Sequence, residues 1–201
     1  VLEHARRKNI QVIYAGSSTK HHGVYKSPYA WSKFSCEQLC ELYHKVYKLQ
    51  ISICRFYNVY GEHQIEDGEF STLMGIFMKQ YREGKPLTIT GDGEQRRDFT
   101  HIDDIVDGLV RCGRSLKIPN AYHSKVSGEI FELGRGINHS INEVASYFGD
   151  YPTKYISKRD GEYDVTLCES DLAHQKLGWV PKENIEDFVR NFVETERFLN
   201  E

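Results

Sequence analysis

The sequence predicts an α/β protein built around a parallel sheet, on three observations. An apolar, β-branched run at residues 10–15, I-Q-V-I-Y-A, ends at Gly16, as a buried parallel strand does. A second such run, I-S-I-C-R-F-Y-N-V-Y-G at residues 51–61, ends in a turn. A stretch with helical spacing lies between the two runs. A strand, a helix and a strand in this order form a βαβ unit, in which the two strands are parallel.

The helix of this unit has a recognisable start and a continuous face. Ser27 can cap it, and Pro28 stands at the first helical position, where the missing N–H costs nothing. We expect the helix to continue to about Tyr47, because a set of residues at helical spacing shares one face. That face is formed by Trp31, Ser35, Leu39, Leu42 and Val46.

Three further elements follow the second strand. Residues 70–81 are apolar-rich and predict a helix. Residues 86–93, P-L-T-I-T-G-D-G, predict a strand and a tight turn. Residues 102–116 predict another helix, since they begin with two aspartates, which are favourable at a helix N-terminus.

The last part of the chain predicts two strands and three helices. A short strand covers residues 129–133, and Ser140 starts a helix in which Glu143 completes a capping box. A strand-like V-T-L-C follows a polar segment, and two helices close the chain. The final helix is expected over residues 185–199.

Composition excludes several classes of protein. The chain has 201 residues, 39% of them hydrophobic, and a formal net charge of -3 without a basic stripe, which argues against nucleic-acid binding. No apolar run reaches the length of a membrane helix. Five cysteines without framework spacing indicate reduced thiols and a cytoplasmic location. The histidines show no ligand spacing, so we expect no metal.

Hydroxyl, amide and amine groups gather at one edge of the predicted sheet. Ser17 and Ser18 follow the first strand, Asn58 follows the core of the second, and Tyr29 starts the helix between them. These positions share the carboxyl edge of the sheet, where α/β proteins bind ligands. Lys33 lies one helical turn after Tyr29. A cation beside a phenol favours the phenolate, which suits a general base for an alcohol; the alternative is a solvated surface pair.

Six motifs in order resemble one family. The sequence is similar to the extended short-chain dehydrogenase/reductase family, specifically its NAD-dependent nucleotide-sugar epimerases and dehydratases. The resemblance implies the C-terminal part of a Rossmann-type sheet at residues 1–61 and a smaller α/β nucleotide-sugar-binding region at 62–201, with the helix at 102–116 packing back on the first part. The motifs are S-P-Y-A-W-S-K (27–33), R-F-Y-N-V-Y-G (55–61), G-D-G-E-Q-R-R-D-F-T-H-I-D-D (91–104), F-E-L-G-R-G (131–136), R-D-G-E (159–162) and L-G-W-V-P (177–181).

The resemblance implies roles for residues of the first part. Tyr29 would be the catalytic acid/base, and Lys33 its partner that also holds the nicotinamide ribose. Ser17 matches the active-site serine or threonine best, although Ser18 stays possible because the following loop is shorter than the family pattern. Tyr57 would contact the cofactor, which is NAD, with NADP not excluded.

The resemblance also implies substrate contacts. Asn58 would contact the diphosphate or the sugar, and Arg97 would bind the nucleotide phosphate, to which its planar fork of donors is suited. Arg159 would add a second cation, and Glu162 would lie near the nucleotide ribose. The implied reaction is epimerisation, expected at C4. Tyr29 removes a sugar hydroxyl proton while NAD takes the hydride, and the hydride returns to the opposite face of the 4-keto sugar.

Two other reactions of the family, 4,6-dehydration and decarboxylation, remain alternatives. The family's dehydratases usually place Asp or Glu two residues after the active-site serine or threonine. Here the segment T-K-H-H follows, and the first carboxylate is Glu37, which favours epimerase over dehydratase. We expect Lys20, His21 and His22 to be solvated loop residues.

The family's Gly-x-x-Gly-x-x-Gly fingerprint is absent from the sequence. We therefore expect a C-terminal portion of such an enzyme, whose partner would be the missing N-terminal segment, and exposed apolar surface near residues 1–15. A homodimer through the tyrosine-bearing helix is a further expectation. The alternative of another class is a non-catalytic remnant or subunit that binds sugar nucleotides.

Overall fold

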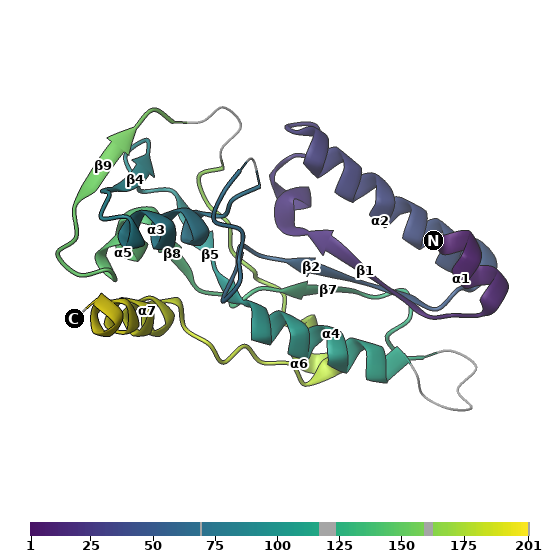
Figure 1. The fold of residues 1–201 in the computed structure, drawn as a ribbon. Helices are drawn as coiled ribbons and strands as arrows, with labels where there is room; N and C mark the ends of the chain where they lie inside the picture. Colours follow the sequence, from purple (N-terminus) through teal and green to yellow (C-terminus); the bar gives the residue numbers. More distant parts are fainter. Residues whose placement is uncertain (69, 117–123, 159–162, 201) are drawn as a thin grey trace.

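The structure has two regions, and a three-stranded parallel sheet lies at the centre of the first (Figure 1). The computed structural model describes residues 1–68, 70–116, 124–158 and 163–200. The strands run in the order β1-β2-β7 and all neighbours are parallel, which confirms the predicted βαβ unit. Their bounds are β1 (Val12–Ser17), β2 (Ile51–Phe56) and β7 (Ile130–Leu133).

Helix α2 (Pro28–Tyr47) connects β1 to β2 and starts as predicted. The Ser27 hydroxyl accepts a hydrogen bond from the Ala30 backbone N–H at 3.1 Å, and Pro28 occupies the first turn. The side of α2 that packs on the sheet buries Ala30, Glu37 and Cys40. Its apolar stripe points away instead, with Trp31, Leu39, Leu42 and Val46 each 46–58% exposed.

The opposite face of the sheet is covered by α4 (Ile102–Leu116) and α6 (Leu172–Leu177) (Figure 1). These helices and the sheet enclose an apolar core that includes Phe131, Leu133 and Trp179. Strand β7 and helix α6 therefore join the first sheet although they come late in the chain. A smaller helix, α1 (Leu2–Lys8), packs beside α2.

The second region has its own core. Strand β4 (Leu87–Thr90) pairs in parallel with β9 (Thr153–Ile156), and Phe77 and Phe148 lie fully buried below them. The helices of this region are α3 (Leu73–Arg82), α5 (Ile141–Ser146) and α7 (Ile185–Asn200). Two short pairs connect the regions: β3 (Val59–Tyr60) with β6 (Thr100–His101), and β5 (Arg96–Asp98) with β8 (Asn138–Ser140).

Several elements agree with the sequence and others differ; β1, for example, ends at Ser17 and not at Ala15. Helix α5 has the predicted capping box between Ser140 and Glu143. Helix α3 begins three residues later than expected, because the Thr72 hydroxyl caps it by accepting from the Gly75 N–H. The predicted V-T-L-C strand is wrong, since only Val165 forms a bridge there, to Arg96. Strand β9 was not predicted, because all four of its residues are exposed.

In the described ranges, no helix is both long enough and apolar enough to cross a membrane.

Candidate active site

Tyr29 and Lys33 lie together at the carboxyl edge of the sheet. The Lys33 ammonium is 5.9 Å from the centroid of the Tyr29 ring and 5.6 Å from that of Tyr14. It donates a hydrogen bond of 3.0 Å to the carbonyl oxygen of Ala15 in β1. Tyr29 is 55% exposed, so its phenol is open to a ligand. This geometry is compatible with the predicted acid/base role, which remains a prediction.

Ser17 and Ser18 are both buried where β1 passes into the short helix η1 (Ser18–His22). The Ser17 hydroxyl accepts from the Thr19 N–H at 3.3 Å and from the Thr19 hydroxyl at 3.0 Å. It therefore caps η1, and the two serines stay alternative candidates for the hydroxyl that holds a substrate oxygen.

Asn58 and Arg97 line one cavity of about 270 Å³. The cavity lies between the start of α3 and the strands β4 and β5, and Thr72, Thr90 and Phe99 are also in its wall. The Asn58 amide donates to the Asp98 carbonyl and to the Thr166 hydroxyl, both at 2.9 Å, so the protein fixes its orientation.

Two further predicted contacts, Arg159 and Glu162, lie outside the described residues.

Tyr57, the predicted cofactor contact, is buried and hydrogen-bonded within the protein. The residue is 3% exposed, and its hydroxyl donates to Glu132 at 2.9 Å. Burial raises the pKa of the Tyr57 phenol, and the Glu132 charge adds to the effect. Its predicted contact with the cofactor therefore cannot use this hydroxyl without breaking a buried hydrogen bond.

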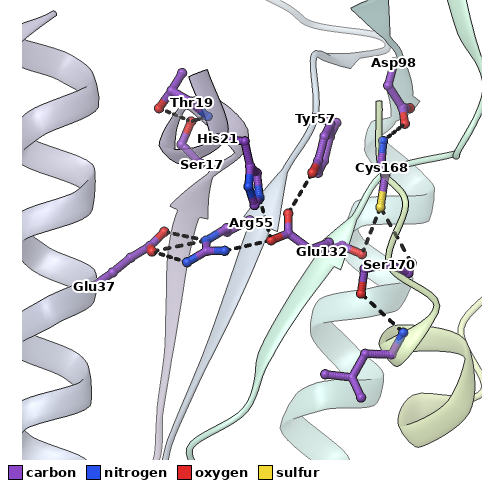
Figure 2. A network of polar contacts seen from close by, with 11 residues as sticks. Ser17, Thr19, His21, Glu37, Arg55, Tyr57, Asp98, Glu132, Cys168 and Ser170 are labelled. Carbon is purple, nitrogen blue, oxygen red and sulfur yellow. Dashed lines mark hydrogen bonds and ion pairs between the residues drawn. The ribbon is translucent and has the colours of Figure 1, made fainter. Parts of the chain in front are cut away.

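A buried ionic cluster lies next to these residues, and sequence reasoning missed it (Figure 2). We call it the Glu132 cluster, formed by His21, Glu37, Arg55, Tyr57 and Glu132. Arg55 donates to Glu37 at 2.7 Å through Nη2 and to Glu132 at 2.7 Å through Nη1. The His21 imidazole is 2.9 Å from the same Glu132 oxygen. Burial alone would raise the pKa of Glu132, but the hydrogen bonds from His21 and Arg55 and the Arg55 charge lower it to about 2.

The sheet register explains where the cluster forms. Gly16, Arg55 and Glu132 are direct neighbours on β1, β2 and β7, so their side-chain positions share one face. Gly16 leaves room for Glu37 to reach across β1, because a Cβ there would be 2.5 Å from Glu37 Oε1. The signal in the sequence was a charged residue inside each apolar strand, I-C-R-F and I-F-E-L.

The loop histidines were expected to be solvated, and His21 is indeed exposed, with 46% of its side chain accessible. Its imidazole nevertheless also contacts Glu132, which the sequence did not suggest. The His22 ring packs against Tyr163 at 4.7 Å, and its Nε2 is buried without a hydrogen-bond partner in the part of the chain that the structure describes.

The chain is similar to characterised sugar-nucleotide epimerases in sequence and in fold. A UDP-glucuronate 4-epimerase of Thermodesulfobacterium geofontis is 37% identical over 192 residues, which is 90% of this chain and 55% of that protein. A UDP-glucose 4-epimerase of Mycolicibacterium smegmatis is 30% identical over 174 residues, covering 84% of this chain and 52% of that protein. The chain thus spans about half the length of these relatives.

The structural match covers almost the whole chain. A UDP-glucuronic acid 4-epimerase from Bacillus cereus, in complex with UDP-glucuronic acid and NAD, superposes with a TM-score of 0.80 at 27% identity. The match includes 98% of this chain and 65% of that one. The family model described as NAD dependent epimerase/dehydratase matches residues 1–124. The chain therefore belongs to the NAD-dependent epimerase/dehydratase family, within the extended short-chain dehydrogenases/reductases.

Proposed function

We propose that this chain supplies the catalytic and substrate-binding part of an NAD-dependent nucleotide-sugar 4-epimerase. One observation carries the proposal: the Tyr29–Lys33 pair lies at the open carboxyl edge of the parallel sheet. The cavity that contains Asn58 and Arg97 supports it, because its amide and guanidinium groups suit the phosphates of a nucleotide. The epimerases among its relatives support the same reaction class.

The residues present fit one end of NAD. The Lys33 ammonium and the exposed Tyr29 phenol suit the nicotinamide ribose. The sequence contains no Gly-x-x-Gly-x-x-Gly loop for the pyrophosphate. We therefore propose that turnover requires a segment with such a loop in addition to these 201 residues.

The chain's own groups would manage the proton and the orientation of the sugar. Tyr29 would take the proton of the C4 hydroxyl, with Lys33 stabilising the phenolate, while Ser17 or Ser18 binds the same oxygen. Bound NAD would accept the hydride from C4 and return it. Arg97, with Arg159 as a predicted second cation, would hold the nucleotide end so that the sugar can turn. Glu162 remains a predicted ribose contact.

Dehydration or decarboxylation would need a further acid/base beside the serines. Helix η1 carries no carboxylate, and the buried carboxylates of the cluster are already occupied: Glu132 contacts Arg55, Tyr57 and His21, and Glu37 accepts from Arg55. This favours epimerisation.

A homodimer through the exposed apolar stripe of α2 remains part of the proposal. The five free cysteines support a cytoplasmic location.

The decisive experiment reconstitutes the enzyme. The purified chain is mixed with the glycine-rich N-terminal segment of one of its relatives, and UDP-, GDP-, dTDP- and ADP-sugars are assayed for the C4 epimer. Tyr29→Phe should lower turnover by about 10²- to 10⁴-fold, because it removes the acid/base. Tyr25→Phe, at a tyrosine that is 85% exposed, is the matched control and should leave turnover unchanged.

Binding of a sugar nucleotide without turnover in any mixture would favour the other class, a non-catalytic binding subunit.

A further inference from the structure

The Glu132 carboxylate contacts two segments that carry or adjoin the proposed catalytic groups, and it is linked to a third segment through Arg55. Through Oε1 it binds His21, which belongs to η1, the turn that begins at the Ser17–Ser18 pair. Through Oε2 it accepts from Tyr57, the residue before Asn58. Figure 2 shows these side chains converging on Glu132 from separate elements.

The third connection runs through Arg55 to the helix that bears the acid/base. Arg55 donates from Nε to both oxygens of Glu37 at 3.1 Å and from Nη2 at 2.7 Å. Glu37 lies four residues after Lys33 on α2, so it is one helical turn further along the same side. Arg55 and Glu37 are 4% and 0% exposed. Hydrogen bonds between charged groups are strong in such surroundings.

Helix η1 is enclosed by its neighbours on only part of its surface. A cavity of about 570 Å³ lies beside the cluster, and His21, His22, Tyr57 and Glu132 are in its wall. The His21 side chain therefore has open space on one side and a carboxylate on the other. Its hydrogen bond to Glu132 joins the end of η1 to β7.

We propose that Glu132 is a positioning residue for catalysis: acting through His21 and Arg55, it fixes the serine-bearing turn relative to the Tyr29–Lys33 helix. This inference rests on the proposed function. A general base and the hydroxyl that shares its substrate oxygen must be aligned within a fraction of an ångström, and a shift of about 1 Å can cost about 100-fold in rate. A buried carboxylate bound to both segments provides that alignment.

The first test measures how firmly Glu132 holds the η1 turn, and it needs no turnover. We call the contact of Glu132 with His21 the clamp. Hydrogen exchange of the backbone amides of residues 18–22 is followed in the wild-type chain, in Glu132→Gln and in His21→Ala. Both variants should speed exchange in this turn by about tenfold or more, since each loses a charge-assisted hydrogen bond. Glu129→Gln, in the same segment but paired on the surface with Lys176, is the matched control and should not change it.

The second test measures rate in the reconstituted enzyme. Glu132→Gln and His21→Ala should each lower kcat by about 10- to 100-fold. KM should stay within about twofold, because neither residue lines the Asn58–Arg97 cavity. His21→Gln keeps an N–H donor and should restore part of the lost rate. Adding His21→Ala to Glu132→Gln should change kcat by less than about twofold, because both changes break the same contact.

The outcomes separate this inference from the proposed function. Unchanged exchange in η1 would show that the clamp does not exist, and faster exchange with a wild-type kcat would show that it does not serve catalysis. If the wild-type mixture has no turnover, the proposed function fails, and the exchange measurement alone decides whether Glu132 holds the turn.

Discussion

Two buried carboxylates close to each other in the structure are used in opposite ways (Figure 2). Asp98, which is 0% exposed, accepts from the backbone N–H groups of Arg135, Gly136 and Cys168, each at 2.9 Å. Glu132, which is 8% exposed, accepts from the side chains of Arg55 and Tyr57 and contacts the His21 ring. Asp98 therefore holds the main chain at three residues, whereas Glu132 holds side chains that come from η1 and β2.

The two sites also differ in electrostatics. Burial raises the pKa of Asp98, and three backbone N–H groups and the nearby Arg135 do not offset it. Burial acts on Glu132 too, but the direct hydrogen bonds from Arg55 and His21 lower the pKa to about 2. Three backbone N–H donors thus leave the pKa of a buried carboxylate raised, while direct hydrogen bonds from a guanidinium and an imidazole lower it. We therefore assign Asp98 to the scaffold and Glu132 to the site.

The largest effect is expected at the scaffold carboxylate. Asp98→Ala removes the acceptor of three backbone N–H groups, one buried at Cys168 and two part-buried at Arg135 and Gly136, so at about 1–3 kcal/mol for each unsatisfied group the free energy of unfolding should fall by about 4 kcal/mol. Urea denaturation followed by circular dichroism measures this loss. Asp150→Ala, at an exposed aspartate, is the control and should change stability by less than about 0.5 kcal/mol. A loss below about 1 kcal/mol for Asp98→Ala would contradict the scaffold role.

The next effect is a pH dependence that comes from Glu132. A carboxylate whose pKa is lowered by folding stabilises the protein above its unfolded value of 4.5, and the stabilisation disappears as the pH falls toward about 2. At about 1.4 kcal/mol per pKa unit, the loss amounts to about 3 kcal/mol. The contribution of Asp98 to stability changes with pH in the opposite direction, since its pKa is raised on folding and protonation therefore favours the folded state.

Comparing urea denaturation of wild type and Glu132→Gln between pH 5 and pH 2.5 isolates this contribution. The variant should lose less stability than the wild type over that interval. Equal slopes would show that Glu132 is not held as a charged group, and the contrast with Asp98 would then disappear.

Elements with local signals could be predicted from the sequence. The Ser27–Pro28 start of α2 and the Ser140–Glu143 capping box of α5 depend on residues within one turn, and both are present. The βαβ unit followed from apolar runs and is confirmed. The positions of Tyr29 and Lys33 at the carboxyl edge follow from the same topology.

The parts that could not be predicted depend on distant partners. Arg55 and Glu132 are 77 residues apart, and only the β1-β2-β7 register makes them neighbours. Strand β9 has an exposed, polar sequence and pairs only because β4 lies beside it. The apolar stripe of α2 predicted a helix, but the spacing could not show that this stripe points away from the sheet.

The smallest expected loss of stability comes from Gly16→Ala, which tests whether Glu37 has room to move within the Glu132 cluster. Gly16 looked like the end of a strand, yet it lies inside β1 opposite Arg55, and its backbone is not in the left-handed region. An added Cβ would lie 2.5 Å from Glu37 Oε1 and 3.0 Å from Arg55 Cγ. Gly16→Ala should therefore push Glu37 off Arg55 and cost about 2 kcal/mol in urea denaturation.

Gly113→Ala gives the matched control for that substitution. Gly113 lies in helix α4, and among the described residues its added Cβ would come near Ile13 Cδ1, at 3.4 Å. It should stabilise the protein by up to about 1 kcal/mol, since alanine is the better helix former. Opposite signs for the two alanines would show that Gly16 is required by the Glu37 carboxylate and not by backbone freedom. If Gly16→Ala were as harmless as Gly113→Ala, Glu37 could move freely, and Glu132 would have no rigid connection to the helix that carries Tyr29.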